Sequence, residues 1–420
     1  MLRSAFTCRL AAGLLVLATC VATAAVTPAS AGREATTTPC GPIRAGNEAG
    51  ARLKVVGNQI QDTNGHVLTP YGISLVSGPE TVNWRRSEGA VRAQIIASHD
   101  YWHANTVRLQ VSEHMLFKNR TKGRSYNVAF AQSVDRLLCR ILAQGQIPVL
   151  NATTIFTGRD PGPSRRTIRF WRFMSERYGN RFPVIFDLFN EPQVTRNPRT
   201  KRFLPAERAW RIWRDGGTVD GVKWLGMQDL VNEIRIKQKV SNLIWAEEPY
   251  YVAFDKASLN LLPQHLLTGG DIAYTYHKPN MAWDSRSFRD LREVAAKKIA
   301  MVDSEWGQYA APDRPWMCQP DAFSTVPAYL RSLHDASIGL IAWSLQPGAL
   351  VKGTAGVDTV HDGNDWRYTH DARNLAEPNE MSSDYGCTPA AQGQGAGRQV
   401  MDYFGSYSVR PPATLFPKLD

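Results

Sequence analysis

The sequence predicts an α/β fold, a single (β/α)8 TIM barrel preceded by a short N-terminal β-hairpin. Two observations support this prediction. Short apolar runs alternate with helical segments from residue 71 to residue 344, as is typical of βα units around a parallel sheet. The number of these runs is eight, which favours closure into a barrel.

The hairpin is the first element along the chain. Residues 52–56 and 59–61 are short strand-like runs, and Asn64-Gly65 is a strong hairpin signal before residues 66–68. We expect this segment to cap the bottom of the barrel.

The repeating βα units follow the hairpin. The helix expected over 128–144 has its apolar residues on one face with a period of 3.6 residues, and a last helix is expected over 399–407. The strand candidates are residues 71–75, 106–111, 147–151, 184–189, 243–246, 272–277, 300–304 and 339–344.

The N-terminal segment predicts export from the cell. Arg3 and Arg9 precede an apolar run, and small residues at 29–31 offer a cleavage site, so residues 1–31 are interpreted as a secretory signal peptide. A membrane anchor is the alternative, but the run is shorter than the roughly 20 residues needed to span a bilayer. Lipidation at Cys20 is a further alternative.

We expect a flexible lead-in at 32–51, one catalytic domain at 52–410 and a tail at 411–420.

Composition and charge describe an ordinary globular protein. Of 420 residues, 43% are hydrophobic and 21% are charged, and the net charge is +11. The basic residues are scattered and no nucleic-acid motif accompanies them, so we expect no nucleic-acid partner. We also expect no membrane span, no cofactor and a monomeric state. The acidic loop at 358–365 does not have the spacing of an EF-hand, so no metal site is expected.

The cysteines favour two disulfides. Removal of the signal leaves four, and an even number in an exported chain favours bridges over metal binding. Cys318 and Cys387 lie in the loops after strands seven and eight, which are neighbours, so we expect them to pair. Cys40 then pairs with Cys139, although Cys139 lies in an amphipathic helix and a buried thiol is the alternative.

Three strand candidates carry polar residues where they end. The fourth ends in Asn190-Glu191-Pro192, the seventh ends at Glu305, and the second carries Arg108. Residues at the carboxyl ends of barrel strands meet on one face. Two glutamates there can act together, one donating a proton while the other attacks carbon, which is what glycoside hydrolysis requires.

At these residues the sequence resembles glycoside hydrolase family 5, the cellulase-like family of retaining glycosidases. The resemblance is strongest from Phe170-Trp171-Arg172 through Phe186-Asp187-Leu188-Phe189 to the Asn-Glu-Pro run, and it extends over about residues 52–348. It implies that Glu191 is the general acid/base and that Asn190 binds the sugar 2-hydroxyl. Glu305, in a Ser-Glu-Trp-Gly run, matches the nucleophile.

Further residues match the family pattern one by one. The resemblance implies that Arg108 holds the nucleophile, that Trp343 forms the floor of the cleaving subsite and that His277 is the sixth-strand histidine. Trp306 is expected to line the cleft, because it lies at a strand end and a sugar's C–H face stacks on aromatic rings. Trp84, Trp245 and Trp283 are placed at or beyond strand ends for the same reason.

Two departures from the family pattern bear on the substrate. The family usually has Asp-x-His at the end of strand three, where this chain has Asn151-Ala152-Thr153. It usually has His-x-Tyr at the end of strand six, where Pro279 replaces the phenol. Asn151 is therefore a candidate for sugar binding, and Tyr274 or Tyr276 is a candidate to refill the space.

The sequence as a whole predicts a secreted, extracellular, metal-independent retaining glycosidase that cleaves a β-linked polysaccharide or oligosaccharide. An endo-β-glucanase is the favoured activity. A β-mannanase or an exo-β-glycosidase is the alternative within the class. A secreted glycan-binding protein on an inactive barrel is the alternative from another class.

Overall fold

The computed structural model describes most of the chain from residue 53 to residue 416. The described residues are 40, 53–76, 78–81, 84–154, 162–249, 259–277, 293–294, 297–307, 322–345, 349–352, 369–380 and 395–416. The expected signal peptide, the lead-in apart from Cys40, and the pair Cys318 and Cys387 lie outside the described residues.

A closed barrel of parallel strands confirms the predicted fold class. The strands adjoin in the order β10-β11-β12-β3-β4-β5-β6-β9, and β9 pairs with β10 to complete the circle. Every neighbouring pair is parallel, so all strands end on one face. Their bounds are β3 Tyr71–Ser74, β4 Thr106–Ser112, β5 Ile147–Thr153, β6 Ile185–Asp187, β9 Ile244–Glu247, β10 Ile272–His277, β11 Met301–Trp306 and β12 Gly339–Ala342.

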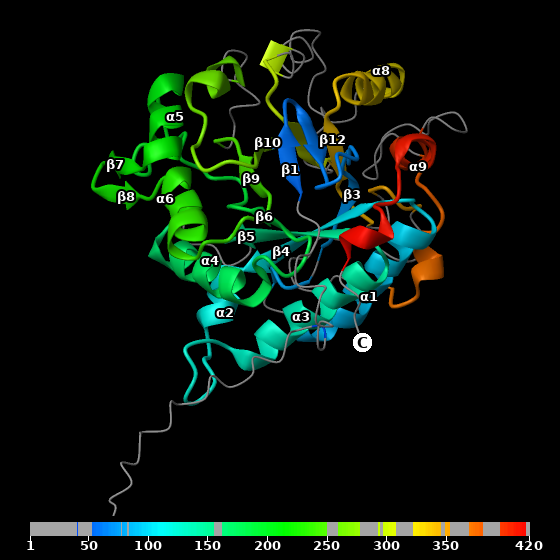
Figure 1. Ribbon diagram of the computed structural model, residues 1–420, viewed down its shortest axis with the longest axis horizontal. Coiled ribbons are helices and arrows are strands. Elements are labelled where there is room, and N and C mark those ends of the chain that lie inside the picture. Colours follow the sequence, from blue (N-terminus) through cyan, green and yellow to red (C-terminus); the bar gives the residue numbers. More distant parts are fainter. Residues whose placement is uncertain are drawn as a thin grey trace, which may run out of the picture. The chain divides into compact units, whose positions relative to one another are not determined.

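Helices lie outside the barrel strands. Figure 1 shows α4, α5 and α6 on one side of the strands and α8 and α9 on the other. Among the described residues, no helix combines the length and the apolar character that crossing a membrane requires. The α-helices are α1 Trp84–Asp100, α2 Glu113–Phe117, α3 Val128–Ala143, α4 Arg165–Tyr178, α5 Ala206–Asp215, α6 Met227–Asn232, α8 Ala322–Asp335 and α9 Ala396–Tyr407. Shorter helices are the π-helix η2 Glu233–Lys237 and the 3₁₀ helices η4 Leu259–Gln264, η6 Ala372–Leu375 and η7 Ala413–Leu415.

The N-terminal hairpin closes the amino-terminal end of the barrel, as expected. Strands β1 (Lys54–Val56) and β2 (Gln59–Gln61) are antiparallel. Leu53, Ile60 and Leu68 belong to the same buried cluster as the inward side chains of the barrel, such as Val149 and Val302. This apolar layer fills the barrel below the polar residues, so the carboxyl ends of the strands are left for chemistry.

The N-terminal segment reverses twice, once more than the Asn64-Gly65 signal indicated. The chain reverses at Gly57, whose φ of +64° suits glycine, and Asn58. Asn64-Gly65 forms the expected turn, across which Gln61 bridges Val67 in antiparallel fashion and the Leu68 amide donates to Ile60 O at 2.8 Å. A second hairpin, β7 (Gly217–Val219) with β8 (Val222–Trp224), has no counterpart among the sequence predictions.

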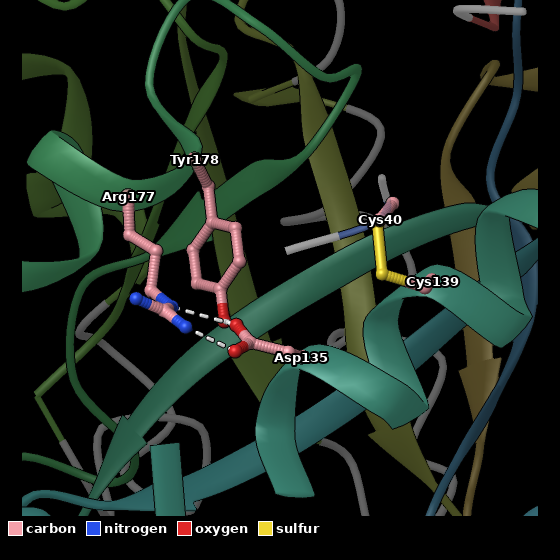
Figure 2. Close-up of a disulfide and its surroundings, with 5 residues drawn as sticks. All are labelled: Cys40, Asp135, Cys139, Arg177 and Tyr178. Atoms are coloured by element: carbon pink, nitrogen blue, oxygen red, sulfur yellow. Dashed lines mark hydrogen bonds and ion pairs between the residues drawn. A yellow bond between two sulfur atoms is a disulfide. The ribbon is translucent and has the colours of Figure 1, made fainter. Parts of the chain in front are cut away.

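A disulfide joins Cys40 to Cys139 on α3, which confirms that part of the cysteine prediction. Figure 2 shows the bridge one helical turn from Asp135, on the same helix. Asp135 accepts hydrogen bonds of 2.6 Å from both Arg177 Nε and the Tyr178 hydroxyl. The bridge therefore ties Cys40 to α3, one turn from the residue through which α3 contacts α4.

Removing this disulfide is expected to lower stability markedly. The bridge spans 99 residues in sequence, and closing a loop of about 100 residues is worth up to about 4.7 kcal/mol in the chain-entropy model. The double variant Cys40→Ser with Cys139→Ser should melt several degrees below the wild type under non-reducing conditions. Reductant should bring the wild type to the melting temperature of the variant and leave the variant unchanged. Equal melting temperatures without reductant would contradict this role.

Candidate active site

Polar side chains from five barrel strands meet at the carboxyl end of the barrel. Successive residues of a strand point to opposite faces, so Arg108 and Gln110 on β4 both point inward. The remaining members are Asp187 on β6, Asn190 and Glu191 just beyond it, Glu247 on β9, His277 on β10 and Glu305 on β11.

Arg108 lies at the centre of this group and has no exposed surface. Its Nε donates to Asp187 Oδ2 at 2.8 Å, one terminal nitrogen contacts Glu305 Oε1, and the other donates to Asn190 Oδ1 at 2.8 Å. The surrounding carboxyl groups outweigh burial and raise the pKa of Arg108 above its ordinary value. It therefore supplies a permanent positive charge beneath the carboxyl groups.

Glu305 is held as an attacking carboxylate would be. Gln110 Nε2 donates to Glu305 Oε1 at 2.8 Å, in addition to the contact with Arg108. Burial raises the pKa of Glu305, while the neighbouring His277 and Arg108 oppose that rise. One oxygen is fixed by two donors, and the side chain keeps 14% exposure, so the group remains accessible.

Glu191 has the properties of a proton donor. Burial raises its pKa to about 7, although the charge of Arg108 acts in the opposite direction. Its Oε1 lies 3.1 Å from His277 Nδ1, and its amide donates to Glu247 Oε1 at 3.0 Å. The φ angle of +46° places its backbone in the left-handed region, which is uncommon outside glycine and is found at functional sites.

The two glutamates that the sequence singled out lie close together. One oxygen of Glu191, one oxygen of Glu305 and one nitrogen of His277 are all within 4.8 Å of one another. Three such atoms also have the spacing of a small cation site. However, the guanidinium of Arg108 already contacts Glu305, and two positive charges a few Å apart repel. We therefore interpret the group as a carboxyl pair bridged by an imidazole.

Asn190 and Asn151 lie within the same polar layer. Asn190 Oδ1 accepts from Arg108 and, at 2.9 Å, from Gln110. Its Nδ2 is buried and has no partner among the described residues, so this amide can donate to a sugar hydroxyl. Asn151 is fully buried, and its Cα pairs in register with those of Gln110 and Asp187. Burial raises the pKa of Asp187, and Arg108 and Asn151 oppose that rise.

Trp343 and Trp306 have different surroundings. Trp343 is half-buried just beyond β12, and its amide donates to Trp306 O at 2.7 Å. Gly307 permits this approach, since a Cβ there would lie 2.5 Å from Trp343 O. The ring of Trp306 is fully buried and stacks on Tyr329 of α8, with centroids 6.4 Å apart. Trp306 therefore does not line the cleft, contrary to expectation, because its side chain points to the helical layer.

Other aromatic expectations also differ from the structure. Trp245 is buried in the barrel interior, and Trp84 packs edge-on against Phe130, so neither lines a cleft. Trp283 and Pro279 lie outside the described residues.

Neither tyrosine considered as a replacement for the missing phenol reaches the polar layer. The Tyr276 hydroxyl lies 3.3 Å from that of Tyr329, and the Tyr274 hydroxyl accepts from the Leu267 amide at 2.7 Å. Both side chains lie on the outer face of β10, opposite to His277.

Gln110, Asp187 and Glu247 are parts of the site that the sequence analysis did not single out. Asp187 and Glu247 interrupt strands that are otherwise apolar, and Gln110 lies two positions after Arg108. Alternation along a strand was the available signal, because i and i+2 share a face.

Comparison with known proteins finds solved structures with a similar fold. A GH5 cellulase from an Icelandic hot spring isolate is 14% identical with a TM-score of 0.56, the match covering 86% of this chain and 96% of that one. The catalytic domain of a Thermobifida fusca endoglucanase in complex with cellotetraose is 14% identical with a TM-score of 0.52, covering 88% and 99%. A Thermomonospora fusca β-mannanase is 14% identical with a TM-score of 0.53, covering 86% and 98%. At these identities the likeness concerns the fold alone.

The family is identified by comparison of the sequence with protein-family models. Among curated proteins no match is found. The model of the cellulase family, glycosyl hydrolase family 5, matches residues 62–349, which include Arg108, both paired glutamates and Trp343. The chain therefore belongs to glycosyl hydrolase family 5 and is a glycoside hydrolase.

Proposed function

We propose that this chain is a secreted, retaining β-glycosidase with endo-β-glucanase as its favoured activity. The observation that supports the retaining mechanism is the short distance between the two glutamates. One carboxyl oxygen of Glu191 and one of Glu305 lie within 4.8 Å of each other. Retaining enzymes place their carboxyl groups about 5 Å apart, whereas inverting enzymes leave roughly 6.5–9.5 Å for a water molecule.

The geometry assigns each glutamate a role. Glu191, whose buried carboxyl keeps a proton to about pH 7, protonates the leaving oxygen. Glu305, held by Arg108 and Gln110, attacks the anomeric carbon and forms a covalent glycosyl-enzyme. Glu191, now ionised, then takes a proton from the incoming water, and the released sugar keeps its configuration.

A β-glucan is favoured over other substrates by the family and by the relatives of similar fold, which include cellulases and an endoglucanase seen with cellotetraose. A β-mannan is the second candidate, because β-mannanases share the fold to the same degree. Export through the predicted signal peptide is part of the proposal and agrees with a disulfide in the folded domain.

A panel of β-glucans, mannans, xylans and aryl glycosides tests the activity directly. We expect the wild type to release oligosaccharides from at least one β-glucan, and Glu191→Gln to be severely impaired on it. A trapped oligosaccharide with no hydrolysis of any substrate would favour the glycan-binding alternative. Activity on mannan alone would replace the glucanase assignment.

The altered sugar subsite predicts weak discrimination between gluco and manno configurations. Asn151 and Thr153 replace an acid and an imidazole, and neither Tyr274 nor Tyr276 supplies the missing phenol. Polar groups discriminate most strongly when a wrong substrate leaves them unpaired. The kcat/KM values for matched gluco- and manno-oligosaccharides should therefore differ by clearly less than about four orders of magnitude.

The same subsite should depend on aromatic stacking. If Trp343 forms its floor, Trp343→Ala should lower kcat/KM on every accepted substrate. Trp306→Phe is the matched control, because the Trp306 ring packs against α8 and should affect stability rather than substrate choice. A substrate whose turnover survives Trp343→Ala unchanged would exclude a common stacking floor.

A further inference from the structure

The mechanism above leaves the carboxyl group of Glu247 without a role, although it contacts two parts of the site. Glu247 ends β9, is 1% exposed, and its backbone oxygen accepts from Trp213 Nε1 at 2.7 Å. Its Oε1 accepts the Glu191 amide at 3.0 Å, and its Oε2 lies 3.2 Å from His277 Nε2. One side chain therefore contacts both the backbone of the proton donor and the imidazole beside it.

The position of the proton on His277 follows from its surroundings. Nδ1 lies 3.1 Å from Glu191 Oε1 and 3.4 Å from Glu305 Oε2. Burial lowers the pKa of His277 to about 4, so the ring is neutral near pH 7 and carries one N–H. An ionised Glu305 can only accept hydrogen bonds, whatever the state of Glu191. The N–H therefore belongs on Nδ1, and Nε2 is left as an acceptor.

An acceptor at Nε2 requires a donor opposite it. Nε2 and Glu247 Oε2 are both buried, lie 3.2 Å apart, and neither makes a hydrogen bond of regular geometry with a described group, including each other. If Glu247 were ionised, a lone pair of its Oε2 would face the lone pair of His277 Nε2, and the two would repel. A protonated Glu247 carboxyl would instead donate a hydrogen bond to Nε2. Burial and the nearby Glu191, Asp187 and Glu305 raise the pKa of Glu247 well above its ordinary value, although Arg108, with a nitrogen 3.7 Å away, acts in the opposite direction.

We propose that Glu247 is a positioning residue: as a neutral carboxylic acid it donates to His277 Nε2 and accepts the amide of Glu191, and so aligns the proton donor. This inference rests on the role proposed for Glu191. The left-handed backbone at Glu191 costs free energy, and the hydrogen bond from its amide to Glu247 offsets part of it. The His277 imidazole, through its contact with Glu191 Oε1, holds the carboxyl end of the same glutamate.

Nitrogen NMR of the imidazole tests the proposal without any substrate. In protein labelled with ¹⁵N-histidine, comparison with His277→Gln identifies the signals of the ring. Near neutral pH we expect the proton on Nδ1 and an unprotonated Nε2. A proton on Nε2 would mean that Glu247 accepts as a carboxylate, and it would overturn the proposal.

Kinetics of two variants give an independent test. In Glu247→Gln the amide can donate to Nε2 and accept from the Glu191 amide, so kcat should stay within about tenfold of the wild type and the alkaline limb of the pH profile should keep its position. In Glu247→Ala kcat should fall about 100-fold, the size of effect expected from a displaced catalytic group, with KM little changed. Glu233→Gln is the matched control, a nearly buried glutamate bonded to Arg172 in the helical layer.

Three results would contradict the proposal. The first is Glu247→Gln as inactive as Glu247→Ala. The second is an alkaline limb shifted about one pH unit toward acid in Glu247→Gln, because loss of a neighbouring negative charge lowers the pKa of Glu191. The third is Glu247→Ala with full kcat. If Glu247→Ala does not fold, the glutamine variant and the NMR result decide. If the wild type hydrolyses no β-glycan, the proposed function fails, and the NMR result still reports on Glu247.

Discussion

Glu305→Ala is expected to lose nearly all turnover, with kcat reduced about 10⁴-fold or more, because no other group can form the covalent intermediate. Azide should restore part of the activity on an aryl β-glycoside with a good leaving group. The small anion enters the space left by the carboxyl and attacks from the same side, which gives an α-glycosyl azide. The measurement is the initial rate with and without azide, together with the configuration of the product.

The same experiment on Glu191→Ala is the natural comparison. There azide should attack the glycosyl-enzyme in place of water that lacks its base, and the product should be the β-glycosyl azide. A β product from Glu305→Ala would reverse the two assignments.

Glu191→Gln is expected to have a large effect that depends on the leaving group. Loss of a general acid costs about 10²–10⁴-fold, so hydrolysis of an oligosaccharide, whose leaving group needs a proton, should fall by that amount. An aryl glycoside with an acidic phenol should form its glycosyl-enzyme almost as fast as with wild type. Pre-steady-state release of the phenol measures that step.

The pH dependence checks the same residue. The donor form of Glu191 is present below its pKa of about 7 and is lost as the pH rises through that value. Wild-type kcat/KM on an oligosaccharide should therefore fall above about pH 7, and this limb should be missing in Glu191→Gln. A wild-type profile that rises through pH 7 would rule out Glu191 as the acid.

Much of the fold could be predicted because its signals are local. Each barrel strand is a short apolar run between helical segments, so the positions of all of them followed from periodicity, with differences of at most two residues at their ends. The β7–β8 hairpin could not be found in this way, because its strands are three residues long and largely exposed. The turn at Gly57 was likewise missed, since Asn64-Gly65 carried the stronger turn signal.

The positions of site residues that belong to a sequence motif could be predicted. The positions of side chains whose orientation depends on packing could not. Asn190, Glu191, Arg108, His277 and Glu305 converge as the family resemblance implied. Trp306 did not follow, because the alternation of β11 turns its ring toward α8. Glu247 belongs to no motif, and its importance appears only when β9 is placed between β6 and β10.

The configuration of the first product tests the central claim most directly. Proton NMR recorded during hydrolysis of a β-linked oligosaccharide, before the sugar equilibrates in water, resolves the two anomers. A double displacement by Glu305 and Glu191 predicts that the β-anomer of the new reducing end appears first and the α-anomer grows in later. Initial appearance of the α-anomer would mean that water attacks directly, and it would contradict the roles given to both glutamates.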